Sequence, residues 1–106
     1  MFKYEMMMAE EKKVTIFFEG DLDIEVTEMM EQEIIPALLA FEKITIDLSH
    51  VSFVDSTGIG LLINLIDTIK NHDNAISVTI SNVQAQVKAI FDIIQLPQIV
   101  GENVFI

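Results

Sequence analysis

Three short runs rich in β-branched residues, each separated from the next by a segment with helical spacing, most constrain how this chain can fold. Such runs are typical of strands, and they occupy residues 13–19, 43–48 and 76–80. Apolar strands that alternate with helices predict an α/β layer whose strands are mostly parallel. Residues 2–9 form a weaker strand, and the polar turn at 10–12 would join it to the first run as a hairpin.

The first predicted helix begins after Gly20-Asp21-Leu22-Asp23 and runs to about Phe41, with Asp23 as its N-cap. Pro36 lies inside it and is expected to kink it or end it early, because proline has no N–H to donate. Its buried face is predicted from the apolar residues near one side, namely Val26, Met30, Ile34, Ala37 and Leu38.

Two further helices are predicted. One covers residues 57–70 and would bury the apolar residues that recur at helical spacing, Ile59, Leu62, Ile63, Ile66 and Ile69. The other is capped by Asn82 and ends near Leu96, because Pro97 follows; it would bury Val83, Val87, Ile90, Phe91 and Ile94. With a short last strand at 104–106, we expect an α/β fold: a single domain over residues 1–106, with a mixed, mostly parallel sheet of four to five strands flanked by helices.

Composition narrows the class of protein. The 106-residue chain is 51% hydrophobic, which suits a globular domain, and it has no cysteine for a disulfide or a thiolate metal site. Its N-terminus lacks the pattern of a signal peptide, and no apolar run is long enough to span a bilayer. We therefore expect a cytoplasmic protein with no membrane partner.

The charge of the chain bears on its partners. Six basic and 17 acidic residues give a net charge of −11. Such a field repels nucleic acid and anionic membranes, so the expected partner is a protein with a neutral or basic docking face. Acidity also keeps a small domain soluble, and charge alone does not separate these two explanations.

The stretch Asp55-Ser56-Thr57-Gly58-Ile59-Gly60 is the candidate functional motif. It follows an apolar run and opens the second predicted helix, so it offers a serine at the positive end of a helix, where a phosphate is favoured. Serine is also a common helix cap with no further role. Asp55 can supply that cap, which would leave Ser56 and Thr57 free to face solvent.

The two glycines of this motif carry a second signal. Glycine within a helix costs about 1 kcal/mol relative to alanine, and the chain places two there, Gly58 and Gly60. A cost of this kind indicates a need for close approach by backbone or by a partner.

Motifs for catalysis are not found. A nucleophile elbow needs glycine at position 54, where this chain has valine, and the glycines at 58 and 60 fit neither a phosphate-binding loop nor a dinucleotide fingerprint. His50 and His72 lie in no catalytic pattern. Asp21, Asp23 and Asp55 could converge as a carboxylate cluster; alternatively, Asp23 is a cap and Asp21 is solvated. We expect no enzymatic activity, no metal and no cofactor.

The second predicted helix carries a candidate docking surface. Leu61 and Leu65 fall opposite its predicted buried face, beside Asn64 and Thr68. Two leucines one turn apart, next to Ser56, would form a docking ridge if they are exposed. Burial by a neighbouring element is the alternative.

The stretch from Asp47 to Leu62, which contains Asp-Leu-Ser-His-Val-Ser-Phe-Val before the serine motif, closely resembles the STAS domain family. It is most similar to bacterial anti-sigma factor antagonists of the sporulation and general-stress type. Gly20-Asp21-Leu22-Asp23 resembles the family's Gly-Glu-Leu-Asp, with aspartate in place of glutamate at position 21. The order of elements fits along essentially the whole chain, so the resemblance implies a STAS-like fold.

The resemblance also implies a partner switch. In such proteins the serine after the aspartate, here Ser56, is phosphorylated by a serine kinase that is also the anti-sigma factor. The unmodified antagonist binds that kinase and frees the sigma factor, and a serine phosphatase resets the serine. The loop that matches Gly20 to Asp23 lies near this site in the family. The expected partner-binding residues are Asp21, Asp23, Asp55, Thr57, Gly58, Gly60, Leu61, Asn64 and Leu65.

Other members of the family serve stress-sensing scaffolds or transporters. The alternative function is therefore a scaffold or transporter-associated interaction protein without a phosphorylation cycle. We expect a monomer or weak dimer that binds no nucleic acid directly.

Overall fold

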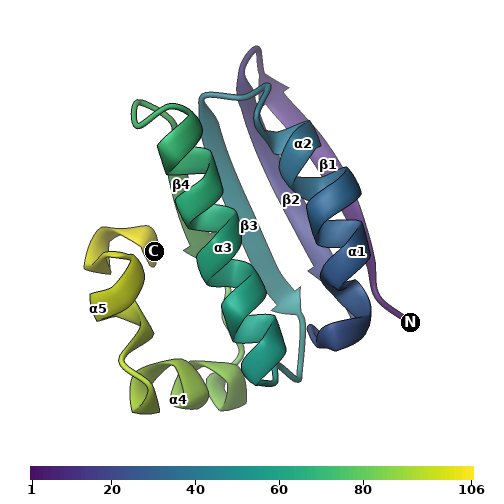
Figure 1. The fold of residues 1–106 in the computed structure, drawn as a ribbon, viewed down its shortest axis with the longest axis vertical. Helices are drawn as coiled ribbons and strands as arrows, with labels where there is room; N and C mark the ends of the chain where they lie inside the picture. Colours follow the sequence, from purple (N-terminus) through teal and green to yellow (C-terminus); the bar gives the residue numbers. More distant parts are fainter.

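A computed structural model describes all residues, 1–106, and its centre is a four-stranded sheet in the order β1-β2-β3-β4. The strands are β1 Lys3–Glu10, β2 Lys13–Glu19, β3 Lys43–His50 and β4 Ser77–Ser81. β1 pairs antiparallel with β2, whereas the β2–β3 and β3–β4 pairs are parallel (Figure 1). The predicted hairpin and the mixed, mostly parallel sheet are therefore confirmed.

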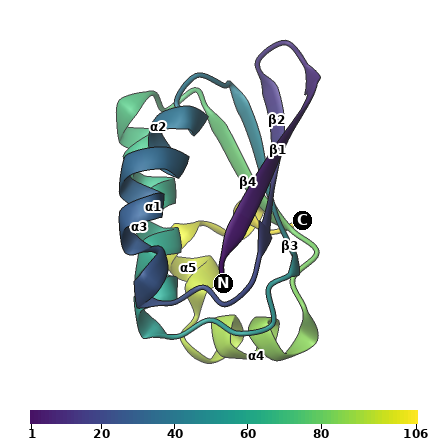
Figure 2. The ribbon, with the colours of Figure 1, turned by 90° about the vertical axis from the view of Figure 1, so that its right-hand side faces the viewer.

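The main helices gather on one face of this sheet. A helical stretch runs through η1 Ile24–Val26, α1 Thr27–Met29, η2 Met30–Ile34 and α2 Ile35–Leu38, and the long helix is α3 Ser56–His72. Viewed edge-on, α1, α2 and α3 lie on the same side of the sheet, and α4 Ala85–Ile93 crosses one end (Figure 2). The other face of the sheet is not buried by helices; it carries Thr15, Thr45 and Thr79 in register across three strands.

The first helix shows how the chain accommodates Pro36. The segment Met30–Ile34 just before it is a π-helix, in which the N–H of Ile35 donates to the carbonyl oxygen of Met30. Because proline has no N–H and crowds the carbonyl one turn earlier, a widened turn relieves the conflict. The helix ends at Leu38 and not near Phe41. Asp23 caps its start, as predicted, by accepting from the N–H of Glu25.

The prediction of one last helix to Leu96 is wrong, because the segment forms two helices, α4 and α5 Leu96–Val100. Gln95 adopts a left-handed conformation (φ 58°) that ends α4, and Pro97 stands in the first turn of α5. Proline suits that place because the N–H of a first-turn residue has no helical partner. Asn82 is also left-handed (φ 57°) and does not cap α4; Gln84 holds the N-cap position.

The C-terminal strand is likewise not formed. Phe105 makes a single parallel bridge to Ile80, after a 3-10 turn, η3 Glu102–Val104. The fifth strand of the expected sheet is thus reduced to one bridge beside β4.

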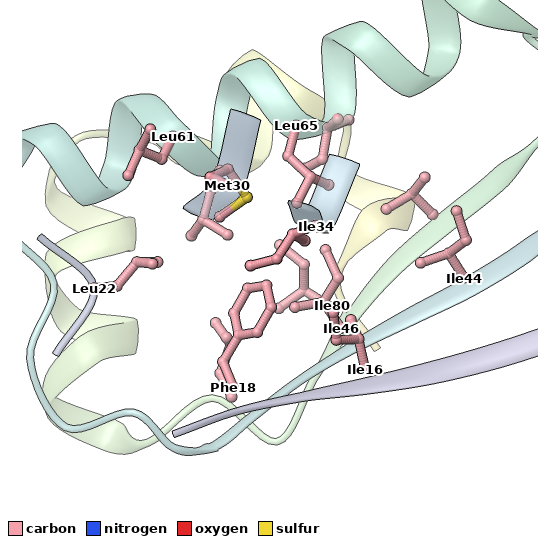
Figure 3. Close-up of a cluster of buried hydrophobic side chains, with 14 of the residues drawn as sticks. Ile16, Phe18, Leu22, Met30, Ile34, Ile44, Ile46, Leu61, Leu65 and Ile80 are labelled. Atoms are coloured by element: carbon pink, nitrogen blue, oxygen red, sulfur yellow. The ribbon is translucent and has the colours of Figure 1, made fainter. Parts of the chain in front are cut away.

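A single hydrophobic core of 27 buried residues fills the space between the sheet and the helices (Figure 3). Along α3 the predicted stripe is partly correct, because Leu62, Ile66 and Ile69 are buried whereas Ile59 and Ile63 are only half-buried. The helix contacts η1, α2 and α5 as well as facing the sheet, so its buried arc is broader than one stripe.

Candidate functional site

The site is built from two loops that lie side by side. The N–H of Leu22 donates to the carbonyl oxygen of Phe53 at 3.0 Å, and the N–H of Asp55 donates to the carbonyl oxygen of Leu22 at 3.3 Å. Leu22 and Val54 form a parallel bridge, and both side chains are buried. The Asp21–Asp23 loop is therefore held by backbone hydrogen bonds against the segment that leads into Ser56.

Asp55 is the N-cap of α3, as predicted. Its carboxylate oxygen Oδ1 accepts from the N–H of Gly58 at 2.8 Å, and its carbonyl oxygen accepts from the N–H of Ile59. The cap leaves Ser56 as the first helical residue, where it is exposed, and Thr57 half-buried beside it. The serine hydroxyl is thus presented to solvent at the positive end of a 17-residue helix.

Gly58 and Gly60 have different roles. A Cβ on Gly58 would lie only 1.9 Å from the carbonyl oxygen of Leu22, so Gly58 is required by the chain's own neighbouring loop. A Cβ on Gly60 would meet nothing within 4 Å, and Gly60 is exposed. The predicted close approach by backbone is confirmed at Gly58, and only Gly60 leaves bare helix surface for a partner.

Of the two alternatives for Leu61 and Leu65, the structure shows burial by a neighbouring element and not an exposed ridge. Leu65 is fully buried and Leu61 is 7% exposed, and both point from α3 toward Met30 and the core (Figure 3). The flanking helices η1 and α2 cover this side of α3, which a single-helix periodicity could not reveal. Neither leucine offers a surface to another protein.

The exposed face of α3 lies elsewhere. Ser56, Gly60 and Asn64 are all exposed and are spaced four residues apart, so they share one side of the helix. Asn64 also accepts a long hydrogen bond, 3.4 Å, from the hydroxyl of Thr68. Of the predicted partner-binding residues on α3, Gly60 and Asn64 are therefore exposed and Thr57 is half-buried.

Two exposed apolar residues at the site are not predicted by the sequence pattern. Ile24 is 67% exposed directly after the Asp21–Asp23 loop, and Phe53 is 48% exposed directly before Val54. Phe53 lies in an apolar run whose neighbours Val51 and Val54 are buried, so nothing in the pattern singled it out. The paired loops place these two residues around the start of α3.

The carboxylates of the loops do not form a metal site. Asp21 is exposed, Asp23 spends one oxygen on the N–H of Glu25, and Asp55 spends one on Gly58. No group of three or more histidine, aspartate or glutamate side chains is arranged to hold a metal ion. His50 and His72 are both exposed. His72 lies in the last turn of α3, where the negative end of the helix dipole favours a basic residue.

The strand that leads to this site, β3, carries a buried carboxylate, that of Asp47. Burial raises the pKa of Asp47, but hydrogen bonds from the hydroxyl and N–H of Ser49 and from the amide of Asn82, together with His50, outweigh burial and lower the pKa below its ordinary value. Asp47 is therefore a stable anion within the fold.

Comparison with known proteins agrees with this architecture. A family model for the STAS domain matches residues 5–105. The structure is similar to Bacillus SpoIIAA in its phosphorylated form, with 21% identity, a TM-score of 0.67, and coverage of 91% of this chain and 86% of that chain. It is similar to an anti-sigma factor antagonist from Mycobacterium paratuberculosis, with 16% identity, a TM-score of 0.78, and coverage of 95% and 84%.

The fold is also similar to the STAS domain of a SulP transporter from Vibrio cholerae, with 22% identity, a TM-score of 0.62, and coverage of 81% of this chain and 69% of that chain. No curated protein matches the sequence. None of the helices has the length and apolar character needed to cross a membrane.

Proposed function

Because this chain belongs to the STAS domain family, we propose that it is an anti-sigma factor antagonist whose binding is controlled by phosphorylation of Ser56. In its unmodified form it binds an anti-sigma factor that is also a serine kinase, and so frees a sigma factor. Phosphorylation of Ser56 by that kinase ends the binding, and a serine phosphatase restores it. The protein itself catalyses no reaction.

The observation that carries this proposal is that Asp55 caps α3 and thereby leaves the neighbouring Ser56 uncommitted. Aspartate and serine are both favoured caps, and a serine that caps its helix has its oxygen engaged. Here Asp55 takes the cap and Ser56 is exposed. A kinase therefore has access to the hydroxyl without unwinding the helix.

The surface around Ser56 suits a protein partner. Gly60 and Asn64 continue the exposed face of α3, and Ile24 and Phe53 add apolar area beside it. A pocket of about 420 Å³ lies next to the Asp21–Asp23 loop; its lining includes the apolar residues Phe2, Val26 and Met29 and the acidic residues Asp21, Asp23 and Glu25. This mixture supports a partner with a basic docking face.

The physical effect of phosphorylation is a block at the interface. A phosphate adds about −1.5 to −2 charge, which the dipole of α3 favours by only about 0.3–1 kcal/mol, or up to about 2 kcal/mol when partly buried. Moving a partner from mostly bound to mostly free takes about 5.5 kcal/mol. Each like-charge pair near 4 Å costs about 4 kcal/mol at an effective dielectric of 20, and the cap carboxylate of Asp55 belongs to the adjacent residue.

This arithmetic implies little refolding. The dipole makes the phosphorylated state tolerable, whereas loss of hydration in the complex drives release, since it also strengthens the repulsion between the phosphate and Asp55. Structures with and without the phosphate should therefore share one backbone, and a large change of fold between them would contradict the mechanism.

The direct test is intact mass after addition of Mg-ATP and extract from the native cell. Wild type should gain one phosphoryl group, and Ser56→Ala should gain none while it still captures the kinase. Thr68→Ala is the matched control, because it removes a half-buried hydroxyl of α3 outside the predicted partner-binding residues and should leave the gain intact. Ser56→Asp should bind the kinase more weakly. Undiminished phosphorylation of Ser56→Ala would refute the assignment.

A second candidate function follows from the similarity to the transporter domain. In that case the same surface binds a scaffold or transport protein and no phosphorylation cycle exists. Absence of phosphorylation in an extract proven active on another substrate, together with copurification in a large or membrane-associated assembly, would favour this function.

A further inference from the structure

The carboxylate of Asp47 lies in the second half of β3, the strand that leads to the loop before Ser56, and the proposed switch does not use it. Asp47 is 6% exposed. Its Oδ1 accepts from the N–H of Ser49 at 2.8 Å and from the hydroxyl of Ser49 at 2.6 Å, and its Oδ2 accepts from the side-chain amide of Asn82 at 2.7 Å. A buried charge is tolerated only when its oxygens are satisfied in this way.

Three side chains at every second position after β4, those of residues 82, 84 and 86, reach toward the end of β3 and the loop after it. Besides the contact of Asn82 with Asp47, the amide nitrogen of Gln84 donates to the carbonyl oxygen of Ser49 at 2.7 Å. The amide nitrogen of Gln86 donates to the oxygen of the Gln84 side chain at 2.6 Å and makes a longer contact, 3.5 Å, with the carbonyl oxygen of Ser52. Gln84 holds the N-cap position of α4, yet its side chain does not cap that helix.

The segment from Ser49 to Asp55, which comprises the last two residues of β3 and the loop after them, is therefore held from two sides. On one side, backbone bonds join His50, Phe53 and Asp55 to the loop that contains Gly20 and Leu22. On the other side, the side chains of Gln84 and Gln86 bond to the carbonyl oxygens of Ser49 and Ser52, and Asn82 bonds to the carboxylate of Asp47. From Val51 to Asp55 this segment has no regular secondary structure apart from the bridge at Val54, so these contacts help to determine where Asp55 and Ser56 lie.

We infer that Gln84 is a positioning residue for Ser56, acting through its hydrogen bond to Ser49 and the loop that follows; this role rests on the proposed function. A phosphoryl acceptor must meet the kinase in a narrow range of geometries, and small displacements lower the rate of transfer. Among residues 82, 84 and 86, Gln84 makes the shortest hydrogen bond to the backbone of this segment, at Ser49 near the end of β3. Asn82 is a poorer probe because its left-handed backbone would itself be strained by substitution.

The first arm of the test needs no kinase. Gln84→Met keeps the length of the side chain and removes the donor, and Gln84→Asn keeps the amide on a shorter stem. Amide hydrogen exchange of Gly20, Leu22, Val51 and Asp55 reports on the loop, because each of these N–H groups bonds to or from it. Loss of one hydrogen bond should speed their exchange about fivefold, with the amides of β2 and of β3 before Ser49 unchanged. Gln98→Met, on an exposed glutamine of α5, is the control.

The second arm measures phosphorylation kinetics with the native kinase. For Gln84→Met we expect the kcat of the kinase to fall about fivefold while KM changes less than twofold, because positioning acts on transfer and not on docking. A rise in KM alone would make Gln84 a docking contact and overturn the inference, as would unchanged exchange at the four amides or an equal rise throughout the sheet. Unphosphorylated wild type would instead refute the proposed function, and the positioning role with it.

Discussion

Gly58 and Gly60 are two residues apart in α3 and are expected to respond oppositely to alanine. Gly58→Ala places a Cβ 1.9 Å from the carbonyl oxygen of Leu22, so the paired loops must separate, and the free energy of unfolding should fall by about 1–3 kcal/mol. Gly60→Ala meets nothing within 4 Å and should raise it by up to about 1 kcal/mol. Urea unfolding of the two variants measures both effects.

Partner binding gives this pair a second use. If Gly60 is glycine for the sake of a partner, Gly60→Ala should be more stable and yet bind the kinase more weakly than wild type. A Gly60→Ala protein that binds as well as wild type would remove Gly60 from the proposed interface.

Asp47 should make the fold sensitive to acid. Its pKa is lowered in the folded protein from the ordinary value of 3.8, so its contribution to stability is complete above that value and is lost as pH falls through the lower folded pKa. Urea unfolding from neutral pH to below 3.8 should therefore show a steeper loss in wild type than in Asp47→Asn, which has no charge to lose. Parallel profiles would show that Asp47 is not the group responsible.

At the scale of the elements, the boundary between α4 and α5 depends on one strained residue. Gln95 is left-handed without the freedom of glycine (φ 58°, ψ 43°), which costs about 1 kcal/mol. Gln95→Gly should therefore raise the free energy of unfolding by about 0.5–1 kcal/mol in a urea titration. Gln98→Gly, inside α5, should lower it, since glycine is a poor helix former. Destabilisation of Gln95→Gly would mean that its side chain contributes something the contacts do not reveal.

The elements that could be predicted from the sequence are those with a strong local signal. β2, β3, β4 and α3 have uninterrupted periodic patterns, and their observed bounds lie close to the expected ones. The last helix was predicted too long because Phe91 and Ile94 keep helical spacing across the break, and Gln95 gives no local sign of a left-handed turn. The sequence predicts that Pro97 ends a helix, whereas it stands in the first turn of α5; both places are compatible with its missing N–H.

For the whole molecule, the acidic surface should limit stability at low salt. Residues 14–42 contain eight acidic side chains and no basic one, namely Glu19, Asp21, Asp23, Glu25, Glu28, Glu31, Glu33 and Glu42. Both ion pairs of the protein, Lys3–Glu19 and Lys88–Asp92, are exposed and contribute little. Raising sodium chloride from about 0.1 M to about 1 M shortens the screening length from about 10 Å to about 3 Å and should stabilise the fold.

The control for this salt effect is a variant with fewer like charges. Glu28→Gln and Glu31→Gln together remove two exposed carboxylates from the helix next to the candidate site, and the pair should show a smaller gain in the free energy of unfolding with salt. An equal gain would attribute the effect to the salt itself and not to repulsion within the molecule.

The candidate site was predictable only as far as its local chemistry. Asp55 as the cap and Ser56 as the exposed hydroxyl follow from residue types at a helix start, and both agree with the structure. The burial of Leu61 and Leu65 and the exposure of Ile24 and Phe53 depend on how η1 and α2 pack beside α3, which no single segment encodes. Long-range packing therefore decided which residues a partner can touch.

The contact of Gly58 with the carbonyl of Leu22 joins stretches of chain more than thirty residues apart. A short peptide around Ser56 therefore carries the hydroxyl but not the surface on which a partner would recognise it. Under the proposed function, an unfolded copy of this protein would neither bind the kinase nor be phosphorylated by it. The strength of the signal would therefore depend on the amount of folded protein and not on the rate of synthesis.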